Sequence, residues 1–315
     1  MSSSDSAPNA TERLTRAIHS LQGLSCGDAF GERFFLHPEV AQSLIAQRAV
    51  PSKPWRYTDD TAMAIAIVEI LEEFGEIHPE GLANNFGKRF IADPHRGYGH
   101  AMHSLLPELA NHPKEWKQLA PQLFKGKGSF GNGAAMRVAP IGAYFADDFE
   151  TAAKQAELSA LVTHSHSEGV SGAIAVALAA GLAWKSKNSP ITPQQFLEEI
   201  YQRTPLSRVR LGIGKARDLA DEVTVEKAVS ILGNGADVSA QDTVPFCLWA
   251  AAHHLDDYES ALWTTVSGLG DRDTTCAIVG GIVAMSAGVA SIPLAGVESR
   301  EPIPAWFLYP RPDQS

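Results

Sequence analysis

Two short segments of the chain each place two carboxylates beside threonine hydroxyls, directly before an apolar stretch. The first is Thr58-Asp59-Asp60-Thr61, and the second is Asp271-Arg272-Asp273-Thr274. Capping is the simple structural explanation, but a helix start needs only one such acceptor, and neighbouring carboxylates repel each other when partly buried. If the two segments converge, four carboxylates and two threonine hydroxyls form an oxygen cage. Mg²⁺ or Mn²⁺ prefers such ligands, and the charge suits two ions.

A glycine-rich segment is a second feature that suits a ligand. Residues 126–133 contain four glycines and match neither the P-loop nor the GxGxxG pattern. Such a loop lets backbone N–H groups approach phosphate oxygens, although a plain flexible turn has the same composition. Phe124 and Phe130 lie beside and within it and offer faces for stacking a base, with core packing as the alternative. Arg96-Gly97-Tyr98-Gly99-His100 is a second, weaker loop of this kind.

Two histidines, His164 and His166, lie between two predicted helices. An HxH pair can bind a metal, but no third ligand accompanies this one, and the acidic segments account for a metal better. A histidine at a helix end commonly serves as a cap or a hydrogen-bonding group, and the functional alternative is a contact to a diphosphate or a ribose. The three cysteines form no CxxC pair and are expected to be buried free thiols.

The elements that must position these residues are predicted to be helices, because apolar residues recur at helical spacing along most of the chain. Leu14, Ile18 and Leu21 recur at helical spacing near the N-terminus, and convincing strand segments are almost absent. Further helices are expected over Thr61–Phe74, Pro79–Ile91, Thr151–Ser165, Glu168–Lys187, Pro193–Arg203, Ala216–Leu232, Thr243–His254, Tyr258–Ser267 and Thr274–Ala290. The sequence predicts an all-α fold with one catalytic domain over residues 11–309. We expect a compact bundle of about ten or more helices, with flexible tails at residues 1–10 and 310–315.

The composition disfavours several classes of protein. The 315 residues carry 36 acidic and 26 basic side chains, and a formal net charge of −10 argues against direct nucleic-acid binding. The two most apolar stretches, Gly169–Trp184 and Thr274–Ala290, are shorter than the roughly 20 residues of a membrane span. No basic region followed by an apolar stretch marks a secretory signal. We therefore expect a cytoplasmic monomer without a membrane partner.

Taken in order, these motifs resemble those of the ADP-ribosylglycohydrolases, also called ADP-ribosyl-acceptor hydrolases. This family includes the bacterial dinitrogenase-reductase-activating glycohydrolases. The resemblance covers about residues 12–290, and the glycine loop is most similar to the branch that acts on serine-linked ADP-ribose and ADP-ribose polymers. The motifs that carry the resemblance are Gly23–Gly31, Tyr57–Met63, Arg96–Gly99, Gly128–Arg137, Thr163-His164, Leu232–Gly235, Val244-Pro245 and Gly270–Thr274.

The resemblance implies an all-α, metal-dependent hydrolase that cleaves the glycosidic bond between ADP-ribose and an acceptor. The acceptor would be a serine or arginine side chain, an ADP-ribose polymer or an ester, and the partner an ADP-ribosylated protein. Two Mg²⁺ (or Mn²⁺) ions would be held by Thr58, Asp59, Asp60, Asp271, Asp273 and Thr274. The candidate catalytic bases are Asp59, Asp60, Asp271 and Asp273. The ADP-ribose would contact Gly97, Gly99, Phe124, Ser129, Phe130, Gly131, Asn132, His164 and Leu248.

Three positions depart from the family pattern. The serine-directed branch has a glutamate four residues after the glycine that matches Gly31, where this chain has Phe35, and the nearest acid is Glu32. Leu269 replaces a usual glycine, and Arg272 replaces a usual small residue or threonine. These departures leave the acceptor open. Two alternatives remain: another binuclear-metal hydrolase that acts on a nucleotide phosphate, and a non-catalytic ADP-ribose-binding or crystallin-like protein.

Overall fold

The computed structural model describes residues 9–219 and 222–304. Over these ranges the chain folds into sixteen α-helices and three short 3₁₀-helices, and they contain no β-strand. The prediction of an all-α fold is confirmed, and the helices outnumber the ten that periodicity indicated. Of the tails expected at residues 1–10 and 310–315, residues 1–8 and 310–315 lie outside the described residues. Asn9 and Ala10 do not belong to a tail, because Asn9 caps the first helix and Ala10 begins it.

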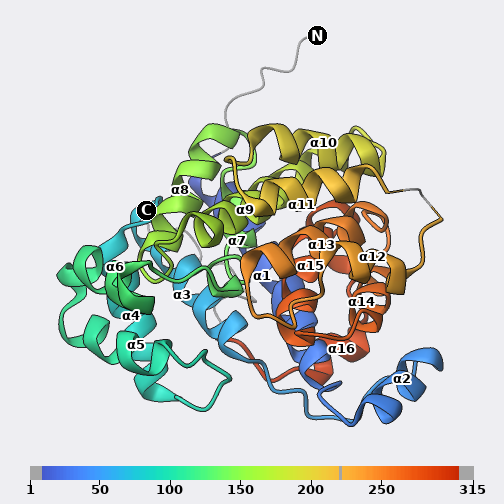
Figure 1. Ribbon diagram of the computed structural model, residues 1–315, viewed down its shortest axis with the longest axis horizontal. Helices are drawn as coiled ribbons and strands as arrows, with labels where there is room; N and C mark the ends of the chain where they lie inside the picture. The colour runs from blue at the N-terminus through green and yellow to red at the C-terminus, as the bar shows by residue number, and fades with distance from the viewer. Residues whose placement is uncertain (1–8, 220–221, 305–315) are drawn as a thin grey trace.

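The centre of the molecule is a pair of helices from opposite ends of the chain. These are α1 (Ala10–Glu32) and α15 (Arg272–Ala287), which lie side by side in the middle of Figure 1. Glycines allow the close approach: a Cβ at Gly27 would overlap the backbone carbonyl of Cys276. This packing brings the last turns of α1 next to the start of α15.

Three further apolar helices complete the core around that pair. They are α3 (Asp59–Phe74), α9 (Ser167–Ser186) and α13 (Ala240–Ala252). By length and composition alone α9 could cross a membrane, but most of it is buried inside the molecule, as in a core helix. Because α3 and α15 each begin with an acidic segment, the core brings both segments to one place.

The remaining helices surround this core. At one side of Figure 1, α4 (Pro79–Ala92), α5 (Met102–Asn111) and α6 (Trp116–Gly126) form a group from which the glycine-rich loop returns to the core. The others are α2 (Pro38–Ala46), α7 (Ala139–Tyr144), α8 (Phe149–Leu161), α10 (Pro193–Arg203), α11 (Arg208–Arg217), α12 (Val225–Leu232), α14 (Tyr258–Ser267) and α16 (Leu294–Ser299).

Several helix boundaries differ from the prediction by one to four residues, and two differences matter for the fold and the site. The single helix expected over Ala216–Leu232 is wrong: α11 ends at Arg217, and Thr224 caps a separate helix, α12. Leu219 continues the apolar period through the turn between them, so periodicity alone did not reveal the break. The last core helix begins two residues earlier than expected, at Arg272, which places the second acidic segment inside its first turn.

Candidate metal centre and ligand cleft

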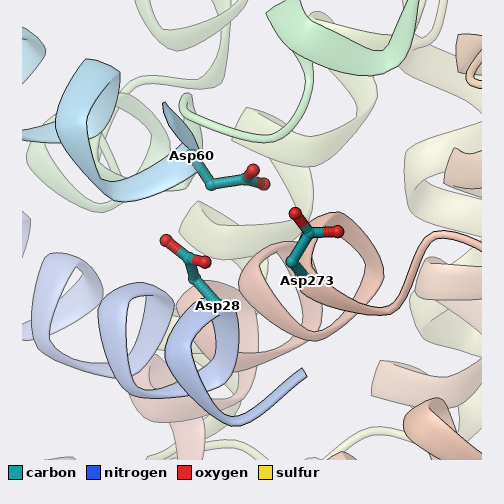
Figure 2. A group of neighbouring side chains, drawn as sticks. All are labelled: Asp28, Asp60 and Asp273. Atoms are coloured by element: carbon teal, nitrogen blue, oxygen red, sulfur yellow. The ribbon is translucent and has the colours of Figure 1, made fainter. Parts of the chain in front are cut away.

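Three aspartates from three helices meet at one edge of the core, two of them buried and the third, Asp273, half-buried. Asp28 comes from α1, Asp60 from the first turn of α3, and Asp273 from the first turn of α15 (Figure 2). One carboxylate oxygen of each lies within 4.8 Å of those of the other two. Oxygens at this spacing can share one cation. The two acidic segments therefore converge, as their composition led us to expect.

Asp28 holds the start of α3 in place. Its carboxylate accepts hydrogen bonds from the backbone N–H groups of Thr58 (3.0 Å) and Thr61 (3.1 Å) and from the Thr61 hydroxyl (2.5 Å). The Thr58 hydroxyl lies between Asp28 (2.9 Å) and Asp60 (3.0 Å), and its single proton serves only one of them at a time. Burial raises the pKa of Asp28 to about 6, against the lowering effect of these hydrogen bonds.

The electrostatics of the cluster suit a divalent cation. Burial, and next the charge of Asp28, raises the pKa of Asp59 to about 8. Burial and the neighbouring carboxylates raise the pKa values of Asp60 and Asp273 well above their ordinary range. Within the described structure, the Oδ1 atoms of Asp60 and Asp273 are buried without a hydrogen-bond partner. A cation supplies the partner that such oxygens lack and removes their mutual repulsion, so these residues fit a metal.

The other two carboxylates of the acidic segments tie this cluster to the surrounding loops. The backbone N–H of Asp59 donates to the carbonyl of Arg96 (2.7 Å), which brings Gly97 against the Asp59 carboxylate. Asp271 accepts a hydrogen bond from the side-chain amide of Asn132 (2.7 Å). The glycine-rich loop is therefore fixed to the start of α15, beside the carboxylates.

A cleft of about 410 Å³ opens next to the cluster, a size typical of small-molecule sites. The glycine-rich loop forms part of its wall. Phe124 and Phe130 expose 55% and 43% of their surface there, and their ring centroids lie 6.4 Å apart. Phe124 and Lys125 adopt left-handed backbone angles (φ +53° and +61°), which non-glycine residues avoid. The backbone at Phe124 is therefore held by its surroundings in a conformation that is locally unfavourable.

The two histidines predicted between helices have different surroundings. His166 caps α9: its Nδ1 accepts a hydrogen bond from the backbone N–H of Glu168 (3.2 Å). His164 is almost fully buried, yet it lines the cleft, and its Nδ1 lies 2.7 Å from the Thr163 hydroxyl. Burial, with the charge of Arg137, lowers the pKa of His164 to about 3. The His164 ring is therefore neutral at ordinary pH.

The structure brings most of the predicted site residues to this cleft. Thr58 and Asp60 are buried behind its wall, in contact with Asp28 and with each other. Leu248 is fully buried in α13 and does not line the cleft, because its position in the helix faces the core. The predicted residues that do line it are Asp59, Gly97, Gly99, Phe124, Ser129, Phe130, Gly131, Asn132, His164, Asp271, Asp273 and Thr274.

Asp28 is the main site residue that sequence reasoning missed. A signal was present: Asp28 stands in a helix whose glycines recur every fourth residue at 23, 27 and 31, which marks a closely packed face where a charge needs partners. Arg137 was overlooked as well. It is fully buried, forms no ion pair within the described residues, and places its guanidinium 4.5 Å from the centre of the Phe86 ring.

Comparisons with known proteins agree with this geometry. The family model described as ADP-ribosylglycohydrolase matches residues 9–307. The proteins named ADP-ribosylhydrolase ARH3 from Homo sapiens and Bos taurus are both 31% identical to this chain over 93% of its length, covering 91% and 90% of their own. A solved structure titled "ADP-ribosylglycohydrolase-related protein complex" superposes with a TM-score of 0.65 at 22% identity, covering 92% of this chain and 93% of that one.

Proposed function

Because this chain belongs to the ADP-ribosylglycohydrolase family, we propose that it cleaves the bond between the anomeric carbon of ADP-ribose and an acceptor with the help of two Mg²⁺ or Mn²⁺ ions. The products would be free ADP-ribose and the unmodified acceptor. The observation that carries this proposal is the convergence of Asp28, Asp60 and Asp273 beside a cleft of suitable size. Family membership supports the hydrolase activity, and the carboxylate cluster supports the metal dependence.

The metal ions would be held by the two acidic segments. The proposed ligands are Thr58, Asp59, Asp60, Asp271, Asp273 and Thr274, with Asp28 fixing the Thr58 end. The ions held by these residues would supply Lewis acidity, which would orient the ribose hydroxyls and activate a water for attack on the anomeric carbon. Their charge also favours the ionised form of the surrounding carboxylates, whose pKa values burial otherwise raises.

The cleft would hold the ADP-ribose along the glycine-rich loop. Phe124 and Phe130 present exposed ring faces for the adenine, where stacking contributes about 1–3 kcal/mol per base. The diphosphate and ribose would contact the polar and backbone groups between these rings and the carboxylates. These groups belong to Gly97, Gly99, Ser129, Gly131, Asn132 and His164.

The general base would be one of the carboxylates that face the cleft. Asp59, Asp271 and Asp273 line it, whereas Asp60 is buried behind the wall. A base must reach a water held near the anomeric carbon, so the three lining carboxylates are better placed than Asp60 to take a proton. Asp60 would then serve to hold the cation.

The rim of the site differs from the serine-directed branch. Phe35 stands where that branch has a glutamate, and the Arg272 guanidinium packs 5.0 Å from the centre of its ring. Glu32 lies one turn earlier on α1, and burial, followed by the charge of Asp28, raises the pKa of its carboxyl group. Glu32 is therefore close to the cluster and is the acid that would assist at this rim. We propose that the protein acts as a monomer. Its partner would be an ADP-ribosylated protein that binds at this rim.

The test measures release of free ADP-ribose from serine-modified and arginine-modified peptides side by side. Each peptide is treated with Mg²⁺, with a chelator, and with Mg²⁺ restored after chelation. We expect release from at least one peptide, loss of release with the chelator, and recovery with the metal. Release from only one peptide identifies the linkage. AMP or phosphate as the product, or release that the chelator leaves unchanged, would overturn the proposal.

A further inference from the structure

A chain of three buried polar groups leads from the core to the cleft. It begins at Arg137 and passes through the hydroxyl of Thr163 to the ring of His164. Both Arg137 and Thr163 are fully buried, and His164 is 5% exposed and lines the cleft. The proposed metal centre and the cleft lining do not use Arg137, a fully buried arginine that forms no ion pair in the described structure.

The direction of the hydrogen bonds follows from what each group can donate. An arginine only donates, so Nη2 of Arg137 gives one hydrogen to the carbonyl of Ser159 (2.9 Å) and the other to the Thr163 hydroxyl oxygen (2.9 Å). The Thr163 hydroxyl has one proton of its own. Among the described residues, the only acceptor within its reach is Nδ1 of His164, at 2.7 Å.

This direction determines the tautomer of His164. Since Nδ1 accepts the Thr163 proton and the ring is neutral, the hydrogen of the imidazole is on Nε2. Nε2 makes no hydrogen bond within the parts of the chain that the structure describes. It lies against the glycine-rich loop: a Cβ at Gly131 would be 3.2 Å from Nε2, and one at Gly133 would be 3.1 Å from it. Glycine at these positions leaves room for the ring.

We propose that Thr163 and Arg137 are positioning residues that fix His164 as an Nε2–H donor toward an acceptor oxygen of the ligand in the cleft. A phosphate oxygen only accepts hydrogen bonds, so a ring held in this tautomer favours the diphosphate, whereas the other tautomer would present a lone pair to it. The identity of the ligand rests on the proposed function. The tautomer itself rests only on the hydrogen-bond geometry.

The test uses protein labelled with ¹⁵N at histidine, in which long-range proton–nitrogen NMR spectra report which ring nitrogen carries the hydrogen. The signal of His164 is assigned by its loss in His164→Gln. Thr163→Val removes the hydroxyl and keeps the shape, and Thr163→Ser restores a hydroxyl. Thr264→Val is the matched control, because Thr264 makes a comparable contact to His254 (2.9 Å) away from the cleft.

In the wild type and in Thr163→Ser we expect hydrogen on Nε2 of His164. In Thr163→Val we expect loss of this single tautomer, with an ADP-ribose Kd about 10-fold weaker, as for a hydrogen bond of about 1.4 kcal/mol, and a KM that changes more than kcat. Thr264→Val should change neither the tautomer of His164 nor the Kd for ADP-ribose. Hydrogen on Nδ1 in the wild type, or unchanged affinity in a folded Thr163→Val, would overturn the inference. If the wild type does not bind ADP-ribose, the proposed function is refuted. The NMR spectrum then still tests, separately, whether His164 is fixed as an Nε2–H donor.

Discussion

At the scale of single residues, the cluster is a set of charges that the folded chain does not balance by itself. Asp60 and Asp273 each bury a carboxylate oxygen that has no hydrogen-bond partner in the described residues. The Asp28 carboxylate already accepts hydrogen bonds from Thr58 and Thr61. Isolated buried carboxylates are costly, and their raised pKa values express that cost. Ionisation of this cluster is therefore unfavourable without a positive charge beside it, which a bound cation would supply.

We therefore expect Asp60→Asn and Asp273→Asn to lose hydrolysis by at least about 100-fold, because each removes a charge that binds the cation. Calorimetric titration with Mg²⁺ or Mn²⁺ should show weaker or absent saturable binding in both variants. The control is Asp256→Asn, an exposed aspartate far from the cleft lining, which should bind metal and turn over like the wild type. Near-normal turnover in Asp60→Asn would remove Asp60 from the metal centre.

Residue types and spacing predicted much of this site, but only where a local pattern existed. Thr58, Asp59 and Asp60 are consecutive and precede an apolar helix, so their chemistry is visible in the sequence. Asp28 is separated from them by thirty residues and joins them only through the packing of α1 against α3. Leu248 shows the opposite problem, since an apolar residue suits a core and a base-binding wall equally well, and only the fold reveals that it faces the core.

At the scale of elements, the segment after α16 braces the acidic start of α3. Its backbone pairs with Trp55, which donates to Ser299 (2.8 Å) and accepts from Glu301 (2.7 Å). The Glu301 carboxylate binds both terminal nitrogens of Arg96 (2.7 and 3.2 Å), a bidentate pair. Arg96 in turn accepts from the backbone N–H of Asp59. The segment after α16 thus supports Asp59, one of the proposed metal ligands, from more than two hundred residues further along the chain.

We expect Glu301→Gln to weaken metal binding several-fold while lowering the free energy of unfolding by only about 1 kcal/mol, because the partly buried pair is broken but the core is untouched. Metal titration and thermal melting measure the two effects. Glu298→Gln is the matched control, since its ion pair with Lys53 (3.5 Å) is exposed and contributes little. Equal metal affinity in Glu301→Gln and Glu298→Gln would show that the brace does not reach Asp59.

Helices with a clear apolar period were predictable, and those without one were not. α10 and α14 have the boundaries that the sequence indicated. α2, α5, α6, α7 and α16 were missed. α2 and α16 bury few side chains, α5 and α6 each contain a proline, and α7 is only six residues long, so none shows a sustained helical pattern in the sequence. The brace from Glu301 to Arg96 was invisible for a different reason: it joins segments about two hundred residues apart through polar contacts that follow no period.

At the scale of the whole molecule, the carboxylate cluster links folding to both pH and metal. The pKa of Asp59 is about 8 and that of Asp28 about 6 in the metal-free fold, above their values in the unfolded chain. Between about pH 4 and pH 8 these carboxyl groups therefore hold more protons in the folded state than in the unfolded state. Below about pH 6.5 the buried His164, whose pKa is lowered to about 3, holds fewer and opposes them, so the effect of the carboxyl groups is clearest between about pH 6.5 and pH 8. Stability falls wherever the unfolded state binds fewer protons, so it falls as pH rises through this window.

We expect the melting temperature in a chelator to decrease from about pH 6.5 to pH 8, because the free energy of unfolding falls by up to about 1.4 kcal/mol per pH unit for each carboxyl group that stays protonated in the fold. Mg²⁺ or Mn²⁺ would bind the ionised cluster and would stabilise the folded state according to its occupancy, so the increase in melting temperature on adding metal should grow with pH. Parallel melting curves at pH 5, 6, 7 and 8, with metal and with chelator, measure both slopes. Asp60→Asn has one buried charge fewer. In this variant the melting temperature in chelator should fall less steeply with pH, and the increase on adding metal should grow less steeply with pH. A melting temperature in chelator that rises with pH above about pH 6.5 would mean that the protein itself balances the carboxylates, and the electrostatics would then give no reason for a resident metal.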